Sequence, residues 1–387
     1  MTAWPTVYLH EVAMIDRTGV APSDIADGTL YVGLEHIETG GRLLDIKPVA
    51  NGDLASSKFR FTPKHVLYGK LRPYLAKIAT PDFSGVCSTD ILPIMPGARL
   101  DRSYLTHFLR QPSMVDYATS RSEGANLPRL SPKALAEFEI PLPPLDEQRR
   151  IAGILDQGDA LRRLRTRALD KLNSLGQAIF HEMFGDPATN PKGWPIGTIG
   201  DLLAEAKYGS SGKANSEGRG LPMLRMGNVT YDGRIDLSDL KHIELSDKEF
   251  DKYTTRPGDL LFNRTNSKEL VGKTAVVTRP EPMAIAGYLV RARANARGNT
   301  HYISGYLNSA HGKAVLRSMC KNIVGMANIN AKEFQSISIA IPPVELQRAY
   351  ADKLASVRAE ETKIQASLDG VSTLFASLQH HAFRGEL

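Results

Sequence analysis

The two halves of the chain repeat one another, and this repeat constrains the fold more than any other feature. Each tryptophan precedes a proline, at Trp4 and Trp194, and the two positions are 190 residues apart. Ile140–Arg150 (IPLPPLDEQRR) matches Ile339–Ala349 (IAIPPVELQRA), and the alignment needs no gap from Leu130 to Phe184. A match of this length indicates tandem duplication of a unit of about 190 residues. Whatever one copy forms, the other is expected to form as well.

The first part of each copy is expected to mix strands with short helices. Gly41–Leu43 corresponds to Gly233–Ile235, and Pro63–Arg72 corresponds to Pro257–Asn266. Short β-prone runs alternate with glycine and proline turn signals, and short helical runs lie between them. The expected elements are strands over Thr6–Leu9, Val66–Tyr68, Asp259–Phe262 and Thr274–Val277 and helices over Ser103–Leu109 and Tyr302–Leu307. The predicted fold class is α+β, with two tandem-duplicated globular domains.

A long helix is expected to close each copy. The proline pairs Pro143-Pro144 and Pro342-Pro343 exclude helix before them. No proline occurs from Asp146 to about Phe184, or from Glu345 to about Phe383, and both runs favour helix. Each helix should be on the order of 55 Å long at about 1.5 Å per residue.

The apolar stripe of such a helix needs a partner. In the second helix, apolar residues recur every seven positions at Val357, Ile364, Val371 and Leu378, which is heptad spacing. We expect the two helices to pair as an antiparallel coiled coil; the alternative is that each helix packs on its own domain. The predicted segments are a first globular domain over residues 1–140, a central helical spacer over 141–190, a second globular domain over 191–340 and a C-terminal helical spacer over 341–387.

Motifs for chemistry are scarce. Glu269–Thr274 (ELVGKT) resembles the end of a phosphate-binding loop, but Ser267 stands where that loop needs its first glycine. His380 and His381 have no acidic partner at metal-ligand spacing. We therefore expect no catalytic residue and no metal site in this chain. Two cysteines provide no disulfide framework, and no apolar run approaches a membrane span or a signal peptide, so a cytoplasmic protein is expected.

Basic side chains in both globular domains suggest a nucleic-acid partner. The net charge of +6 permits a polyanionic partner without requiring one. Lysine and arginine neutralise phosphates, and arginine and asparagine also hydrogen bond to base edges; the alternative is an ordinary solvated surface. The candidate DNA-binding residues are Lys58, Arg60, Lys64, Lys70, Arg72, Lys77, Lys207, Lys213, Arg219, Arg225, Arg264, Asn266, Lys268 and Lys273.

With the repeated Pro-Pro-x-x-x-Gln motif in view, the chain resembles the specificity (S) subunits of type I restriction-modification enzymes over its full length. Pro143, Pro144 and Gln148 carry the motif once, and Pro342, Pro343 and Gln347 carry it again. Members of this family have two target recognition domains, each followed by a helical spacer. The endings FHEMFGD (Phe180–Asp186) and HAFRGEL (His381–Leu387) also resemble the family's spacer ends.

The resemblance implies a non-catalytic subunit that binds double-stranded DNA. It would bind no cofactor itself, because two methyltransferase (M) subunits would supply the S-adenosylmethionine site and restriction (R) subunits would use ATP and Mg. The two domains would recognise a bipartite, non-palindromic target, while the spacers dock the M subunits. The expected docking residues are Pro143, Pro144, Gln148, Leu172, Ile179, Pro342, Pro343, Gln347, Val371 and Leu378. Two alternatives remain open: a free-standing DNA-binding regulator and a coiled-coil protein adaptor.

Overall fold

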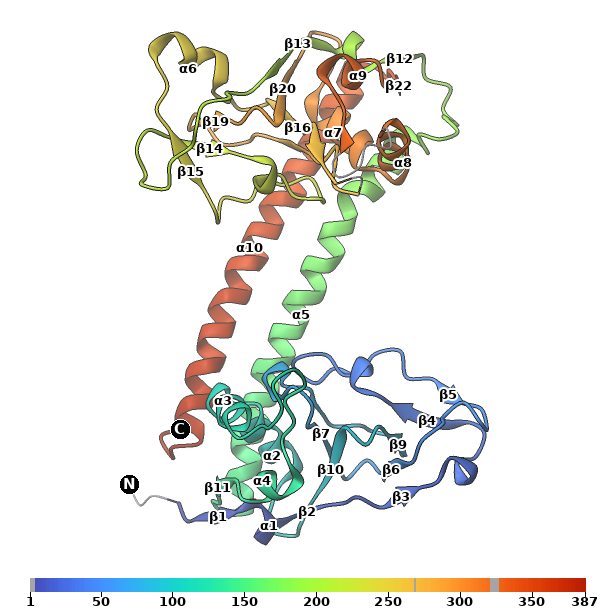
Figure 1. Cartoon of the computed structure of the whole chain (residues 1–387), viewed down its shortest axis with the longest axis vertical. Coiled ribbons are helices and arrows are strands. Elements are labelled where there is room, and N and C mark those ends of the chain that lie inside the picture. Colours follow the sequence, from blue (N-terminus) through green and yellow to red (C-terminus); the bar gives the residue numbers. More distant parts are fainter. Residues whose placement is uncertain (1–3, 268, 321–326) are drawn as a thin grey trace. The chain divides into compact units, whose positions relative to one another are not determined.

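The computed structural model describes residues 4–267, 269–320 and 327–387, which form two compact units. Unit 1 contains the described residues up to Thr166 together with Ala366–Leu387, and unit 2 lies within Arg167–Gln365. Each unit mixes helices with sheets, which confirms the expected α+β class (Figure 1). The two long helices, α5 (Leu145–Phe184) and α10 (Val344–Ala382), each contribute one segment to each unit.

Unit 1 is built from three sheets and four short helices. The first sheet pairs β1 (Thr6–Tyr8) with β11 (Glu139–Pro141). The second has the order β2 (Ala13–Ile15), β10 (Ile91–Pro96), β7 (Val66–Gly69), β8 (Ile78–Ala79). The third has the order β3 (Gly19–Val20), β6 (Lys58–Phe61), β9 (Gly85–Cys87), β4 (Thr29–Val32), β5 (Pro48–Val49). The short helices are α1 (Leu9–Val12), α2 (Arg102–Leu109), α3 (Pro112–Ser120) and α4 (Pro132–Ala136), with 3₁₀ turns at Pro22–Asp24, Leu34–His36 and Pro73–Leu75.

Unit 2 has four sheets among its described residues. The first pairs β12 (Ile196–Thr198) with β22 (Ser338–Ala340). The second has the order β13 (Leu203–Tyr208), β20 (Leu289–Ala294), β16 (Leu260–Asn263), β18 (Thr274–Val276). The others are β15 (Lys241–Ile243), β14 (Leu221–Leu224), β19 (Ala284–Ile285), and the pair β17 (Thr265–Asn266), β21 (Ala327–Asn328). The short helices are α6 (Asp247–Tyr253), α7 (Thr300–Asn308), α8 (Ala310–Met319) and α9 (Ala331–Gln335), with 3₁₀ turns at Ile199–Leu202 and Met226–Asn228.

The strand pairings confirm that the two units are copies of one fold. The antiparallel pair β1 and β11 recurs as β12 and β22, and the parallel pair β4 and β9 recurs as β14 and β19. The four-stranded order β2-β10-β7-β8 recurs as β13-β20-β16-β18. Gly41 and Gly233 both have positive φ, at 82° and 83°, as the shared turn requires.

Most of the elements expected from sequence are present. The run over Val66–Tyr68 lies in β7, and those over Asp259–Phe262 and Thr274–Val277 correspond to β16 and β18 with ends differing by one residue. The strand expected over Thr6–Leu9 ends at Tyr8, because Leu9 begins α1 and turns its side chain into the core.

The long-helix segments run antiparallel within each unit. In unit 1, Arg150 Nη2 donates to the backbone oxygen of Leu387, and Arg165 Nε donates to Ser367 Oγ at 3.0 Å. In unit 2, the Tyr350 ring packs on Phe180 and Phe184. The same segments also contribute to the apolar cores: Ile151 and Phe375 in unit 1, Phe180 and Tyr350 in unit 2. Pairing with the other helix and packing on a domain therefore occur together.

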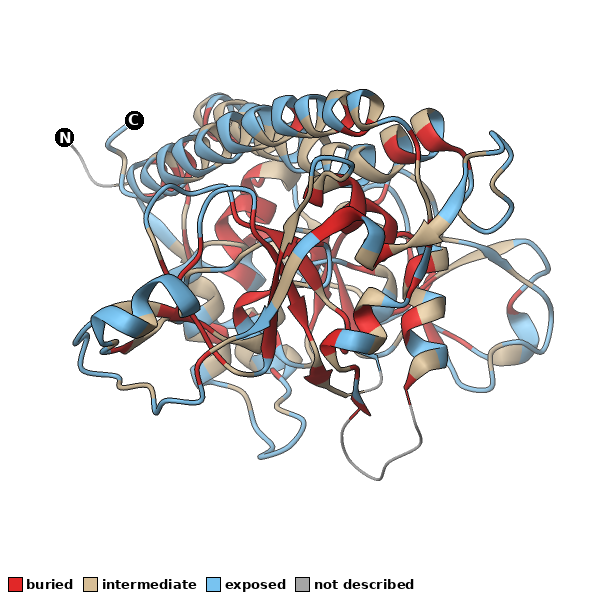
Figure 2. Cartoon of the chain, turned by 90° about the horizontal axis from the view of Figure 1, so that it is seen from above, coloured by how far each residue is buried: buried red, intermediate tan, exposed pale blue. Residues whose placement is uncertain are grey.

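Burial is concentrated in inner strands of the four-stranded sheets. Every residue of β7 and of β16 is buried, whereas β1, β2 and β12 contain no buried residue. Figure 2 shows much of the two long helices as exposed or intermediate. Within the described parts of the chain, we find no helix that is both long enough and apolar enough to span a membrane.

Candidate nucleic-acid interface

Both units place a basic residue immediately after one inner strand of the four-stranded sheet, β7 in unit 1 and β16 in unit 2. Lys70 follows β7, where its N–H donates to Asp90 O and its oxygen accepts from Leu130 N, both at 2.9 Å. Arg264 follows β16 and makes the equivalent bonds, to Tyr288 O at 3.1 Å and from Ile329 N at 2.9 Å. The backbone therefore holds the same three segments together in both copies.

We call the unit 1 group cluster 1, comprising Lys70, Arg72, Asp90 and Arg129. Asp90 Oδ1 accepts from Arg129 Nε at 3.3 Å, and Lys70 Nζ lies 3.9 Å from the same oxygen. Arg72 is exposed, and its N–H donates to Pro128 O at 2.7 Å. Two cations thus lie close to one carboxylate, and the exposed Arg72 follows two residues after Lys70. The cluster therefore carries excess positive charge for an anionic partner.

Cluster 2, in unit 2, comprises Tyr208, Arg264, Tyr288 and Asn328. The Arg264 guanidinium lies over the Tyr208 ring, 4.8 Å from its centroid, and Nη1 donates to Gly287 O at 3.4 Å. The two tyrosines are 42% and 52% exposed. Asn328 is exposed, and its Oδ1 accepts from Thr265 Oγ1 at 3.0 Å. This cluster offers aromatic faces and amide and guanidinium donors, where cluster 1 offers mainly charge.

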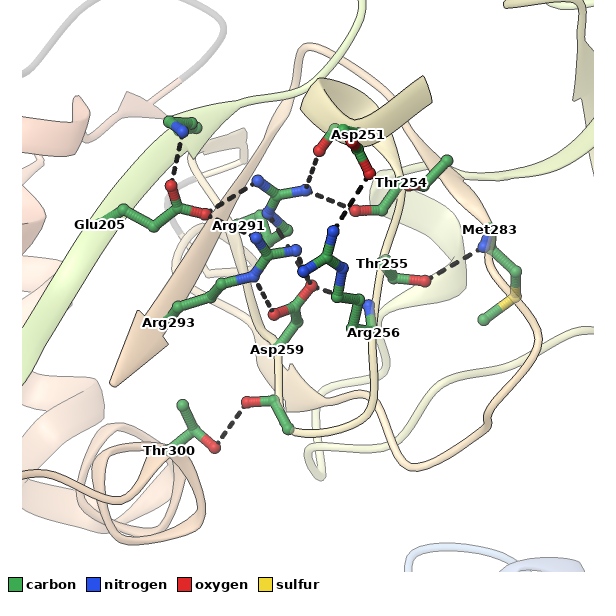
Figure 3. Close-up of polar contacts among 12 residues, drawn as sticks. Glu205, Asp251, Thr254, Thr255, Arg256, Asp259, Met283, Arg291, Arg293 and Thr300 are labelled. Carbon is green, nitrogen blue, oxygen red and sulfur yellow. Dashed lines mark hydrogen bonds and ion pairs between the residues drawn. The ribbon is translucent and has the colours of Figure 1, made fainter. Parts of the chain in front are cut away.

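A buried charged network supports the sheet that carries cluster 2 (Figure 3). Arg291, on β20, is 0% exposed, and Asp259, just before β16, is 2% exposed. Arg291 Nη2 donates to Glu205 Oε1 at 3.0 Å, and Nη1 donates to the backbone oxygen of Thr254. Arg293 donates to both oxygens of Asp259, at 2.7 and 3.2 Å. The network joins β13, β16 and β20 to the segment after α6.

The charges of this network are balanced locally. Burial raises the pKa of Glu205, but the hydrogen bond from Lys207 and the charges of Arg291 and Arg293 outweigh it, so the pKa lies below its ordinary value. In unit 1 the position equivalent to Arg291 is Pro93. Pro93 pairs with the second residue of β7, just as Arg291 pairs with the second residue of β16. The network is therefore specific to unit 2 within the described residues.

Several candidate DNA-binding residues have their charged groups engaged inside their own unit. Lys58 is buried, and its Nζ donates to the backbone oxygen and Oγ of Ser56 at 2.6 and 2.7 Å. Lys77 Nζ donates to Leu34 O at 2.7 Å, and Arg225 Nη2 donates to Asp239 Oδ2 at 2.8 Å. These three groups bind protein atoms that hold a loop or strand end, so they do not present free cations to DNA.

The other candidates differ in their surroundings. Arg60, Lys64 and Lys213 are exposed. Lys207 and Arg219 are exposed but pair with Glu205 and Glu217. Asn266 lies in β17 with its Oδ1 accepting from Ser267 N, burial lowers the pKa of Lys273, and Lys268 lies outside the described residues. The structure thus brings Lys70 together with Asp90 and Arg129, and separately places Arg264 beside Tyr208, Tyr288 and Asn328. The sequence does not predict these five neighbours.

The glutamines of the repeated motif are anchors within each unit, and this corrects their expected place on a docking surface. Gln148 and Gln347 are both 0% exposed. Gln148 Nε2 donates to Arg99 O and Pro143 O at 3.0 and 2.8 Å, and its Oε1 accepts from Asp101 N at 2.8 Å. Gln347 makes the equivalent three bonds, with Arg297 O, Pro342 O and Asn299 N. Each glutamine therefore fixes the start of a long helix to its own domain.

Other expected docking positions are also partly covered. Pro143 and Pro342 are buried, whereas Pro144 and Pro343 are exposed. Leu172 and Val371 are half-buried, and Ile179 and Leu378 pack against the core of their own unit. The exposed apolar residues of the long helices are instead Leu161, Leu164, Leu175 and Leu374.

Comparisons with known proteins agree with this two-copy architecture. A family model for the type I restriction modification DNA specificity domain matches residues 3–174 and again residues 191–368. The specificity subunit of the type I restriction enzyme EcoKI from Escherichia coli K12 is 27% identical over 319 residues, covering 76% of this chain and 67% of that protein. The EcoDI specificity subunit of Escherichia coli is 28% identical over 186 residues, covering 47% of this chain and 41% of that protein.

A solved structure shares the fold. The type I restriction-modification S subunit from M. genitalium aligns with a TM-score of 0.61 at 13% identity, covering 98% of this chain and 96% of that chain. Two matches to the family model, in tandem, span most of the sequence and fall on the two copies that the strand pairings define. The chain belongs to the family of type I restriction-modification specificity subunits.

Proposed function

We propose that this chain selects the DNA target of a type I restriction-modification complex by recognising a bipartite, non-palindromic sequence with its two units. The observation that carries the proposal is the pair of clusters. The same backbone hydrogen bonds hold them at equivalent places, yet Lys70, Asp90 and Arg129 in one correspond to Arg264, Tyr288 and Asn328 in the other. Equivalent positions with different donors and acceptors suit two different half-sites.

The two long helices would set the distance between the half-sites. We propose that α5 and α10 pair along their length as an antiparallel coiled coil, continuing the contacts made inside each unit. The DNA between the half-sites would then be a gap of fixed length and unspecified sequence.

The catalytic steps would belong to other subunits. Two M subunits would carry the S-adenosylmethionine site, and R subunits would use ATP and Mg; this chain would bind none of these. The experiment is single-molecule methylation sequencing of DNA from cells that express this chain with its neighbouring M subunit, compared with cells that express the M subunit alone. We expect a gapped, two-part methylation motif that appears only when this chain is present. A continuous motif would contradict recognition by two units, and the absence of new methylation despite a stable complex would favour the regulator or the adaptor.

The exposed leucines of the long helices are the proposed docking surface for the M subunits. Leu164 and Leu374 are 55% and 58% exposed, so their replacement disturbs little internal packing. We expect Leu164→Arg combined with Leu374→Arg to weaken co-purification with the M subunit at least tenfold, because each change places a charge at an apolar contact. The matched control is Gln157→Arg with Ser377→Arg, at exposed polar positions of the same helices. Equal co-purification of both double variants would exclude this surface.

A further inference from the structure

We propose that Arg264 recognises a guanine in the half-site bound by unit 2, through two parallel hydrogen bonds from its guanidinium to guanine O6 and N7. This inference rests on the proposed function and assigns a base to one position of the recognised DNA sequence. It requires that the guanidinium be held in a fixed orientation, that two of its donors remain free, and that the surroundings suit a base better than a phosphate.

The orientation of Arg264 is fixed from two sides. Its guanidinium stacks on Tyr208, and the Tyr208 hydroxyl in turn accepts from Ala331 N at 2.9 Å, so the ring is itself anchored. On the other side, Nη1 donates to Gly287 O. The Arg264 backbone is held between Tyr288 and Ile329. Less conformational entropy is lost when such a preorganised side chain binds than when a mobile one does.

The free donors that can reach a ligand are on the two terminal nitrogens of the guanidinium. Nε is buried and has no hydrogen-bond partner among the described residues. Nη2 is not among the fully buried unpaired atoms and has no partner within the described ranges, and Nη1 keeps its second hydrogen after bonding to Gly287. Both terminal nitrogens therefore keep hydrogens to donate, and guanine presents two adjacent acceptors in the major groove. Adenine presents a donor beside its acceptor at the same edge and would not match.

The surroundings favour a base over a phosphate. Arg264 is only partly exposed and lies beside Tyr208, Tyr288 and Asn328, whose ring faces and amide suit contacts with bases. A phosphate requires only a cation, such as the exposed Lys213. In unit 1 the equivalent residue is Lys70, a single ammonium close to Asp90, which cannot make the planar bidentate contact. The inference therefore applies to unit 2 alone.

The experiment compares the methylation motifs of complexes that contain the wild-type chain, Arg264→Lys or Arg264→Gln. The wild-type motif should contain an invariant guanine in one half. Both variants should lose the preference for that guanine by about tenfold to a hundredfold and leave the other half unchanged. Lys70→Ala identifies the half bound by unit 1, because it should alter only that half. Arg279→Ala is the control, since Arg279 is an exposed arginine of unit 2 paired with Glu281.

Two outcomes would overturn the inference while leaving the proposed function intact. The first is a gapped motif with no invariant guanine in the half assigned to unit 2. The second is that Arg264→Lys keeps the wild-type motif, while Arg264→Gln weakens binding equally for all sequences and lowers the salt dependence of binding by about one counterion, as expected for a phosphate contact. Failure of the proposed function is distinct, because the wild-type chain would then give no gapped motif at all. Thermal unfolding of each variant checks that cluster 2 stays folded.

Discussion

Replacing Asp259 by alanine is expected to destabilise unit 2 by about 3 to 5 kcal/mol, the cost of leaving a buried cation without its partner. Asp259 binds Arg293 through both oxygens, and Arg291 Nε lies 3.8 Å from its carboxylate. Because Arg291 is wholly buried, water cannot solvate its guanidinium in place of the missing Asp259 carboxylate. Asp259 Oδ2 also accepts from Arg256 N at 2.9 Å, so the turn before β16 should loosen as well. The measurement is urea unfolding followed by hydrogen exchange, with unit 2 peptides expected to lose protection.

The control for this variant is Asp251→Ala. Asp251 also pairs with an arginine, Arg256, at 3.1 Å, but its side chain is 84% exposed. An exposed pair contributes at most about 1 kcal/mol, so this control should unfold close to the wild type. Equal effects of the two substitutions would show that burial does not determine the strength of the network.

Replacing either motif glutamine by leucine is expected to cost about 3 kcal/mol in its own unit. Leucine removes three hydrogen bonds and leaves one backbone N–H and two backbone oxygens without their partner, which is more costly than the loss of an exposed bond. In Gln148→Leu the loss falls on Arg99, Asp101 and Pro143. Hydrogen exchange should show faster opening at the start of α5 in Gln148→Leu and at the start of α10 in Gln347→Leu.

The comparison for the glutamine variants is Gln157→Leu, an exposed glutamine of α5. It makes the same chemical change without removing an internal bond and should alter the free energy of unfolding by less than about 0.5 kcal/mol. If Gln148→Leu were as stable as Gln157→Leu, the buried amide would not be an anchor.

The sequence predicts the repeat, the fold class and the long helices well, because these depend on local patterns. The two proline pairs predict helices from Asp146 and Glu345, and the helices begin one residue earlier, at Leu145 and Val344. Local sequence patterns do not show which charged side chains are buried. Lys58 belongs to a run of basic and aromatic residues in the sequence, but it lies on β6, which turns its side chain inward. The sequence does not predict the roles of Arg291 and Arg293, because their partners are distant in the chain.

The candidate site shows the same limit. Alignment of the copies paired Lys70 with Arg264, since both are basic, and the structure places them at equivalent positions. The same alignment does not identify Asp90 and Tyr288 as equivalent positions, because one side chain is acidic and the other is aromatic. Gln148 and Gln347 were assigned to docking from family resemblance, and only their bonds to backbone groups about 50 residues away identify them as anchors.

The way in which the clusters are held has a consequence for how such a protein can evolve. Positions 70 and 264, and their neighbours at 90 and 288, are fixed by main-chain hydrogen bonds that any residue except proline at the donating positions can make. Substitution there changes the exposed chemistry without removing a bond on which the domain depends. One half of the recognised sequence can therefore change by single mutations while the other half is inherited intact, so new specificities are accessible without a less stable intermediate.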